Sequence, residues 1–382
     1  MVQQEGPALK LSVIIANYNH RNFVGAAIES ALAVDWPHKE VIVVDDASTD
    51  DSRSIIDGFR GRVIAYYRPK SYQLGAHIFG FGKSTGDVII FLDADDLLEP
   101  EVMQEVVKVW RPGVSQVQYR MNLIDSSGTQ LGTAIPQFPR KNDPAKLRRN
   151  YLRTITYTTP PGSGSAYARD FVARAYAIPT PPTIRWSDHV LHPLAPVLGD
   201  VLTIRKPLAR YRIHAAQNGG MLGSLDAGKL RYRMQEDVHK ARFFGSVAQQ
   251  LGLPAPHDPL RHNLTHLQPR LASYLMEPEA HPFPEDKLSS LVYRLMYSAT
   301  ISSQMRVRDR AILIAWTIAC VLAPPSTRRN FVLWRFDAMS RPQAIKALLG
   351  VLSSLRSPRL PDQTRNKPSR AETGHLGVRR WG

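Results

Sequence analysis

The sequence predicts an α/β protein with a mostly parallel sheet flanked by helices, followed by a smaller helical region. Two observations predict it: short β-branched apolar runs alternate with helical patterns up to about residue 110, and only helical patterns remain after about residue 226. The 382 residues are enough for about two units. We expect an α/β domain over 1–223, a helical region over 224–352 with membrane association as an option, and a basic disordered tail over 353–382.

Four apolar runs are the predicted parallel strands. Each is too short for an isolated helix and too apolar for a surface strand. They cover Leu11–Ala16, Val41–Val44, Val63–Tyr67 and Val88–Leu92. Between the first two, Phe23–Leu32 has apolar residues at helical spacing.

The second half of the α/β domain is less regular. Pro- and Gly-rich stretches at Thr159–Ser165 and Ile178–Pro182 predict loops, which often line binding sites. Beyond it, the pattern predicts helices around residues 226–251, 287–303, 307–323 and 328–350. Ala311–Ala323 is the most apolar segment, but it is shorter than the ~20 residues that cross a bilayer. We expect a buried helix there, with an interfacial membrane helix as the alternative because arginines flank it.

The bulk composition restricts the partners. The net charge of +16 should attract polyanions such as anionic lipid headgroups or phosphorylated substrates. No basic stripe with interleaved aromatics is evident, so we expect no nucleic-acid partner. The single cysteine, Cys320, cannot form an internal disulfide, and residues 1–10 lack the charged lead and apolar run of a secretory signal. We therefore expect a cytoplasmic protein, with peripheral contact on the inner face of an anionic membrane as an option.

The strongest chemical signal is Phe91–Asp96, where an apolar strand runs into three carboxylates. Residues two apart in an extended segment point the same way, so Asp93 and Asp95 can face one hard cation. Oxygen ligands suit Mg²⁺ or Mn²⁺. The alternative is a purely structural role, in which the aspartates cap a helix over Leu97–Val109. Asp96 alone would suffice for that role.

A second acidic group, Val43–Asp51, also ends a buried strand. One aspartate here could accept hydrogen bonds from a nucleobase imide or a ribose hydroxyl, while Ser48 or Thr49 caps the next helix. After the first strand, Ala16–His20 replaces the glycine-rich turn of dinucleotide-binding folds, which counts against NAD and FAD. Tyr18 in this segment could stack on a base or simply pack.

Together these segments resemble glycosyltransferase family 2. The resemblance covers roughly Leu9–His214, and its motifs are modest singly but specific in their order and spacing. They are Ser12–Asn19, Ala27–Leu32, Glu40–Asp50, Gly75, Gly86–Asp96 and Leu98–Pro100.

The resemblance implies a GT-A type, Rossmann-like domain that binds a nucleoside-diphosphate sugar, with a uridine nucleotide as the expected donor. It implies that Tyr18 and Asp46 contact the base and that Asp45 supports their pocket. Asp93 and Asp95 become the family's D-x-D, with Asp95 as the direct ligand of Mn²⁺ or Mg²⁺. The residues that the resemblance assigns to donor binding are Ala16, Tyr18, Asp45, Asp46, Gly75, Asp93 and Ala94, and His214 joins Asp95 and Asp93 as a candidate at the metal.

The family also places an acceptor-activating base about ninety residues after the D-x-D, usually in a Glu-Asp pair. The match is Asp188, and the departure is Ser187 where glutamate is common. A base within hydrogen-bond reach of the acceptor hydroxyl would support direct displacement with inversion of the anomeric centre. A structural role for Asp188 is the alternative.

The resemblance leaves donor sugar, acceptor and linkage open. The motif of processive synthases, Gln-x-x-Arg-Trp, is missing from the sequence, so we expect addition of one or few sugars to a glycan or glycolipid acceptor in cell-surface polysaccharide or glycolipid assembly. Two alternatives remain: a degenerate scaffold that binds nucleotide sugar or glycan without turnover, and, more remotely, a phosphatase of the haloacid-dehalogenase type. In the latter, Asp93 would attack phosphorus and Asp95 would protonate the leaving group.

Overall fold

The structure is a computed structural model that describes residues 9–139, 143–214, 227–254, 258–302, 305, 307–336 and 342–343. The chain divides into two compact units, 1–339 and 340–382, and every helix and strand given below lies in the first. The boundaries predicted at 223 and 352, and the predicted basic tail, lie outside the described residues.

The first half of the α/β domain is a regular parallel sheet. All four predicted strands are present, in the spatial order β3-β2-β1-β4. The register places Asn17 opposite Asp45 and Ala16 opposite Asp93, so the strands end together at one edge. The elements are β1 (Leu11–Asn17), α1 (Val24–Leu32), β2 (Lys39–Asp46), α2 (Ser52–Asp57), β3 (Ile64–Arg68), α3 (Tyr72–Lys83) and β4 (Val88–Asp93).

The second half extends the same sheet in mixed directions. β8 lies antiparallel between β4 and β6, whereas β9 runs parallel to β6 over a long stretch. The sheet order is β3-β2-β1-β4-β8-β6-β9-β5, with β7 paired to β6. The elements are β5 (Leu97–Leu98), α4 (Val102–Val109), β6 (Val114–Ile124), β7 (Gln130–Ile135), α5 (Pro144–Thr154), a 3₁₀ turn (Gly162–Gly164), β8 (Ser165–Ala168), α6 (Arg169–Tyr176), α7 (Asp188–Leu198) and β9 (Asp200–Arg212).

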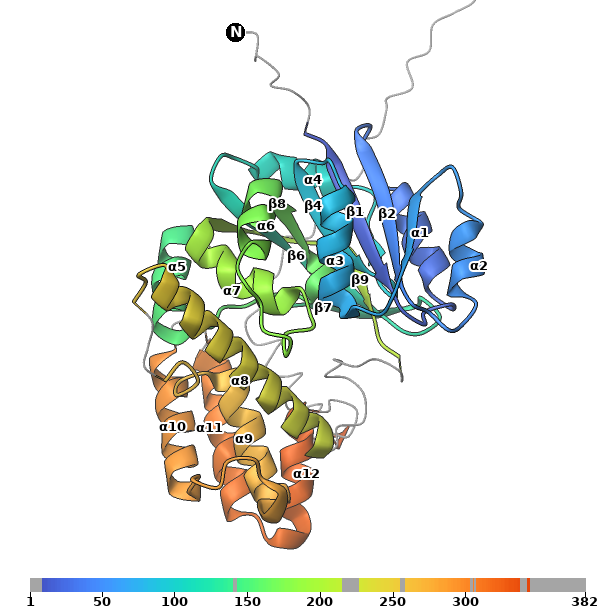
Figure 1. Cartoon of the computed structure of the whole chain (residues 1–382). Helices are drawn as coiled ribbons and strands as arrows, with labels where there is room; N and C mark the ends of the chain where they lie inside the picture. Colours follow the sequence, from blue (N-terminus) through green and yellow to red (C-terminus); the bar gives the residue numbers. More distant parts are fainter. Residues whose placement is uncertain are drawn as a thin grey trace, which may run out of the picture. The chain divides into compact units, whose positions relative to one another are not determined.

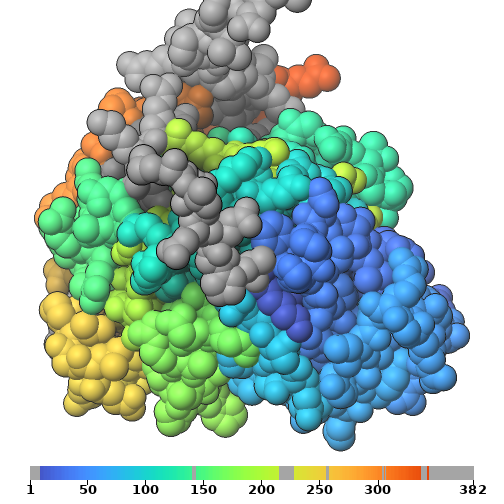
Figure 2. All heavy atoms as spheres, turned by 90° about the horizontal axis from the view of Figure 1, so that it is seen from above, coloured from blue at the N-terminus to red at the C-terminus, as the bar shows by residue number. Residues whose placement is uncertain are grey.

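Helices cover both faces of this sheet. Alternate residues of β1 enter two cores: Val13 and Ile15 pack with α1 and α4, and Ile14 packs with α3, α6 and α7. In Figure 1, α3 and α6 lie on the same side of the sheet. The segments of the first half (blue and cyan) and of the second half (green) adjoin across one surface in Figure 2. The expected fold class, a largely parallel sheet between helices, is confirmed.

Two local predictions are wrong. The helix expected over Leu97–Val109 begins only at Val102, because Leu97 and Leu98 pair with β9 as a short strand. Asp96 does not cap it: its Oδ1 accepts the backbone N–H of Arg212 at 3.0 Å.

The capping prediction for α2 is also wrong. The Ser48 hydroxyl accepts the backbone N–H of Asn19 at 3.0 Å and Thr49 bonds the Asn19 side chain, so both tie the loop after β2 to the loop after β1. Asp50 instead accepts the backbone N–H of Ser52 at the start of α2.

A helical region follows the α/β domain. It contains α8 (Ala227–Gln250), α9 (Leu264–Met276), a 3₁₀ turn (Pro278–Ala280), α10 (Leu288–Ile301), α11 (Val307–Leu322) and α12 (Pro325–Phe336). The helix predicted over 328–350 is confirmed as far as Phe336; most of its remainder lies outside the described residues. α9 was not predicted.

α11 contains the apolar segment 311–323. Its buried side, with Trp316 and Cys320, packs into a core shared with α9, α10 and α12, while Ile318 and Leu322 are 44% and 77% exposed. The segment is therefore a half-buried helix. Among the described helices, none has both the length and the apolar character needed to span a bilayer.

Candidate functional site

The carboxyl ends of β1, β2 and β3 lead into loops that hold non-glycine residues in left-handed conformations. Asn19, Ala47 and Tyr72 have φ of 57°, 68° and 60°. Residues other than glycine rarely adopt positive φ values. The backbone strain costs on the order of 1–3 kcal/mol per residue, and strained residues cluster at functional sites. The conformations therefore draw attention to this edge of the sheet, where both acidic motifs end.

Asp45 and Asp46 at the end of β2 are both buried. Asp45 accepts hydrogen bonds from the Asn17 side chain at 2.8 Å and the Ser48 backbone N–H at 3.0 Å. Asp46 accepts both the backbone N–H and the hydroxyl of Ser71, at 2.6 and 2.7 Å. Asp45 thus fixes the loops after β1 and β2, and Asp46 fixes the start of α3.

Lys70 joins the two residues expected at the nucleobase. Its Nζ lies 3.1 Å from Asp46 Oδ2 and 2.8 Å from the centroid of the Tyr18 ring, which is 42% exposed. Tyr18 and Asp46 therefore lie at one place, with an ammonium group between them. Their contact with a base remains a prediction.

The small residues assigned to donor binding have different surroundings. A Cβ on Gly75 would meet Ser71 Cβ at 2.6 Å, so the missing side chain leaves room for Ser71, which donates to Asp46. Ala94 is 2% exposed and packs in the core, so its contact with a donor remains a prediction. Ala16 is the next-to-last residue of β1 and lies opposite Asp93.

The carboxylates that follow β4 converge. Ligand oxygens of Asp93, Asp95 and Asp96 all lie within 4.8 Å of one another. Asp93 Oδ1 accepts the Gln73 side-chain N–H at 2.6 Å, and the Ser163 hydroxyl accepts the Asp93 backbone N–H at 3.1 Å. Through Ser163, the glycine-rich stretch at Thr159–Ser165 thus helps to fix the position of Asp93 in the D-x-D.

Crowding and burial alter the protonation of this cluster. Burial, with Asp95 and Asp188 nearby, raises the pKa of Asp93 to about 8. Burial and the neighbouring carboxylates Asp95 and Asp93 also raise the pKa of Asp96 well above its ordinary value. A divalent cation would offset this repulsion, so the donor set fits a hard metal ion.

His214, the candidate from the end of β9, lies beside Asp95. Its Nε2 is 2.9 Å from Asp95 Oδ2, and the two side chains are only 6% and 11% exposed. Arg212 anchors this strand end, because its Nε donates to the Asp95 carbonyl at 2.8 Å. The three residues predicted at the metal, Asp93, Asp95 and His214, are therefore neighbours.

Asp188, the candidate base, is the first residue of α7, and its side chain is 36% exposed. Gln73 connects its motif to the D-x-D: Gln73 Nε2 donates to Asp93 at 2.6 Å, and Gln73 Oε1 accepts the Ser187 backbone N–H at 3.2 Å. Sequence analysis missed Gln73, because a lone glutamine at the start of a helix carries no motif. Its role appears only when positions 93 and 187 are brought together.

Ser187, which stands where the family has glutamate, is buried. Its hydroxyl lies 2.8 Å from His77 Nδ1 and 3.2 Å from the Tyr176 hydroxyl, which donates to it. Burial lowers the pKa of His77 to about 3, so this imidazole is neutral at physiological pH. A neutral hydrogen-bonded group therefore occupies the position of the usual glutamate.

The surroundings of Asp188 favour its ionised form. Burial raises the pKa of this carboxyl, but His189, His192 and Lys240 outweigh burial, and the net shift is downward. His189 lies between two carboxylates, 3.8 Å from Asp188 and 3.1 Å from Glu236 of α8. Asp188 is thus a carboxylate near neutral pH and can accept a proton.

Comparisons with known proteins identify a family for part of the chain. The family Glycosyl transferase family 2 matches residues 12–174. An uncharacterized glycosyltransferase from Nostoc sp. is 33% identical over 216 residues, which are 55% of this chain and 66% of the relative. Succinoglycan biosynthesis protein ExoO from Rhizobium meliloti is 28% identical over 150 residues, 37% of this chain and 43% of the relative. The chain thus spans less than two thirds of either relative's length.

Solved structures that are similar to this chain include Staphylococcus aureus TarS 1–349 in complex with UDP-GlcNAc, with a TM-score of 0.48 and 14% identity over 85% of this chain and 90% of that one.

The family match covers the strand ends that carry Asp45, Asp46, Asp93 and Asp95, and it leaves the phosphatase alternative without support. Residues 12–174 of the chain therefore form a glycosyl transferase family 2 domain.

Proposed function

We propose that the protein is an inverting, metal-dependent glycosyltransferase that moves a sugar from a UDP-sugar to a hydroxyl of a glycan or glycolipid acceptor. One observation carries the proposal: Gln73 bonds both Asp93 of the D-x-D and the backbone of Ser187, next to Asp188. A donor-side carboxylate and a candidate base are thereby tied to one amide side chain. Such fixed juxtaposition is what direct displacement between two bound substrates requires.

The donor base would lie against Tyr18 and Asp46. Tyr18 offers an exposed ring for stacking, and Asp46 is a hydrogen-bond acceptor for the imide N–H of uracil. Lys70 would leave the Tyr18 ring to admit the base and could then turn toward the donor's phosphates.

The donor diphosphate would lie over Asp95, flanked by Asp93 and His214, and Mn²⁺ or Mg²⁺ would be held there. When bound, the ion supplies Lewis-acid stabilisation of the charge that develops on the leaving nucleoside diphosphate. The residues of the chain hold and orient that end of the donor.

Asp188 would act on the acceptor. Its carboxylate takes the proton of the acceptor hydroxyl while the hydroxyl oxygen bonds to the anomeric carbon and the bond to the diphosphate oxygen breaks. Its lowered pKa keeps it ready as a proton acceptor at neutral pH. Attack from the side opposite the leaving group inverts the anomeric centre.

The acceptor class is proposed from the name of a relative. The Rhizobium relative is named for succinoglycan biosynthesis, which supports a polysaccharide or glycolipid acceptor.

Membrane contact is proposed from the surface of the chain and its charge. α11 exposes Val307, Ile318 and Leu322, and the chain carries a net charge of +16. The exposed apolar residues and the positive charge both support peripheral contact with an anionic membrane on its cytoplasmic face.

The test is a panel of nucleotide sugars with Mn²⁺ or Mg²⁺, read out as nucleoside diphosphate release with and without candidate acceptors. Asp95→Ala should remove all turnover. Asp188→Asn should keep donor binding but lower acceptor-dependent turnover by about 10²–10⁴-fold, the usual contribution of a positioned base. Asp51→Ala is the control, since its side chain is 76% exposed.

The outcomes separate the alternatives. Tight donor binding by wild type without turnover on any acceptor would favour the non-catalytic scaffold. Full acceptor-dependent turnover in Asp188→Asn would show that another group is the base.

A further inference from the structure

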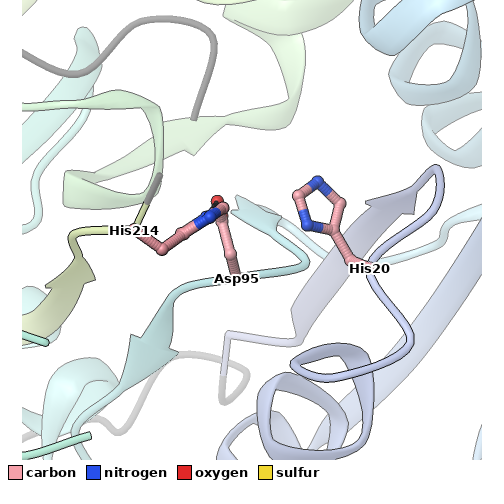
Figure 3. Close-up of side chains that lie close together, drawn as sticks. All are labelled: His20, Asp95 and His214. Atoms are coloured by element: carbon pink, nitrogen blue, oxygen red, sulfur yellow. Dashed lines mark hydrogen bonds and ion pairs between the residues drawn. The ribbon is translucent and has the colours of Figure 1, made fainter. Parts of the chain in front are cut away.

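A second set of metal-ligand side chains shares Asp95 with the aspartate cluster. Ligand atoms of His20, Asp95 and His214 all lie within 4.8 Å of one another. Figure 3 shows the His20 ring, from the loop after β1, on the opposite side of Asp95 from His214, which follows β9. We propose that these three residues form the cation site and that His20 makes the site prefer Mn²⁺ to Mg²⁺. The inference rests on the proposed function for the presence of a cation, and it changes the ligand set.

The spacing of the three groups fits ligands of one ion. Asp95 Oδ2 and His214 Nε2 are 2.9 Å apart, and two ligands ~2.1 Å from an ion at right angles are separated by about 3 Å. The His20 and His214 ring centroids are 6.1 Å apart. Rings bound through nitrogen on nearly opposite sides of an ion would have centroids about 6 Å apart, given the same bond length.

Aromatic packing fixes the position of the His20 ring. Phe23 packs against His214 with centroids 4.7 Å apart and lies 6.3 Å from His20, so one aromatic side chain contacts both imidazoles. Within the described part of the chain, no hydrogen bond to a His20 ring nitrogen is formed, so these nitrogens are available to a ligand.

The alternative set, Asp93, Asp95 and Asp96, shares Asp95 with this site, but its other two members already make hydrogen bonds. Asp93 Oδ1 accepts from the Gln73 side chain and Asp96 Oδ1 accepts from the backbone N–H of Arg212. Only the second oxygen of each therefore remains for an ion.

Two imidazoles also select the metal. Mg²⁺ prefers oxygen ligands and dehydrates reluctantly. Mn²⁺ also favours oxygen ligands, but as a first-row transition metal it binds imidazole nitrogen better than Mg²⁺ does. Removal of one imidazole should therefore cost Mn²⁺ binding more than Mg²⁺ binding. This difference distinguishes a ligand from a residue that merely stabilises the loop.

The experiment measures metal binding to the donor-free protein. Free Mn²⁺ is followed by electron paramagnetic resonance and Mg²⁺ by calorimetry, for wild type, His20→Ala and His20→Gln. Both variants should weaken Mn²⁺ binding at least tenfold, comparable to the loss of metal-site partners in general, and change Mg²⁺ binding by less than about threefold. His38→Ala is the matched control, since His38 is exposed and precedes β2, whose other end carries Asp46.

A spectroscopic count of the ligands completes the test. Electron spin echo modulation from ¹⁴N should report two bound imidazoles in wild type and one in either His20 variant. Unchanged modulation, or equal losses of Mn²⁺ and Mg²⁺ binding, would overturn the inference. Because no donor is present, a failed donor screen leaves this result standing, and an unchanged metal preference leaves the transfer proposal intact.

Discussion

The two acidic strand ends of the sheet handle negative charge in opposite ways. At the end of β2, the chain itself supplies the donors: Asn17 and Ser48 bond Asp45, and Ser71 bonds Asp46. At the end of β4, Asp93, Asp95 and Asp96 lie against one another, and the pKa of Asp93 rises to about 8 because of burial and its carboxylate neighbours.

This difference distinguishes two roles. Asp45 and Asp46, with the residues that bond them, stabilise the fold, and we call them the frame. Asp93, Asp95 and Asp96 form a reactive site. A buried carboxylate is tolerated when donors surround it, so the chain itself stabilises Asp45 and Asp46 before any donor base is bound. The β4 cluster is relieved only by protons or by a cation, so its state depends on pH and on metal. Breaking the first should damage folding, and changing the second should alter ion and pH responses.

The largest effect is expected from Asp45→Ala. The variant leaves the half-buried Ser48 backbone N–H and one N–H of the buried Asn17 amide without this acceptor, which should lower the free energy of unfolding by about 2–3 kcal/mol. Urea denaturation measures this loss. Asp51→Ala, at an exposed position, should change stability by no more than about 0.5 kcal/mol. Equal stability of the two variants would contradict the role of Asp45 as part of the frame.

Sequence patterns predicted both strand ends because the information is local. A β-branched run followed by aspartates, as in Val41–Asp46 and Val88–Asp96, indicates a buried strand and its polar end within a few residues. The family resemblance, and not this local pattern, added Tyr18, His214 and Asp188, and the structure places them at this edge or next to it.

Long-range pairing was not predictable in the same way. Leu97 and Leu98 looked helical, but their partners in β9 come more than one hundred positions later. Gln73 bonds groups 20 and 114 positions away, and no pattern in a single sequence links them. For this reason the strands in the second half of the domain were not predicted. β6 and β9 are long, but shifts in their register interrupt the regular alternation of buried and exposed residues.

The next effect is on stability against pH in the metal-free protein. Asp93 has a folded pKa of about 8 against an ordinary 3.8, so the folded form retains a proton that the unfolded chain loses, and stability falls as pH rises toward 8. Burial lowers the pKa of His77 to about 3 and of His192 to about 4, which makes stability rise with pH up to about 6.5. The fall should therefore emerge between pH 6.5 and 8.

The slope of this fall is at most about 1.4 kcal/mol per pH unit for one group. Thermal unfolding in EDTA measures it, and saturating Mn²⁺ should remove it by displacing the proton. Asp93→Asn, which cannot ionise, should reduce the fall even without metal, and Asp96, whose pKa is also raised by burial, should account for what remains. A slope above pH 6.5 that is identical in Asp93→Asn would show that Asp93 does not control it.

The smallest effect is expected from Gln73→Leu, which keeps the size of the side chain but removes the link between Asp93 and Ser187. The variant leaves Tyr18, Asp46 and Asp95 unchanged, so we expect KM for the donor to change by less than about threefold while kcat falls about tenfold, since misplacement near the reacting groups mainly affects the transition state. Steady-state kinetics with a verified donor and acceptor separates the two constants. Gln73→Glu should restore the acceptor for the Ser187 N–H but place a carboxylate against Asp93, so its kcat should stay low and its pH profile should shift upward. Equal falls in kcat and in the folded fraction would instead assign Gln73 to the frame, on the β2 side of the comparison.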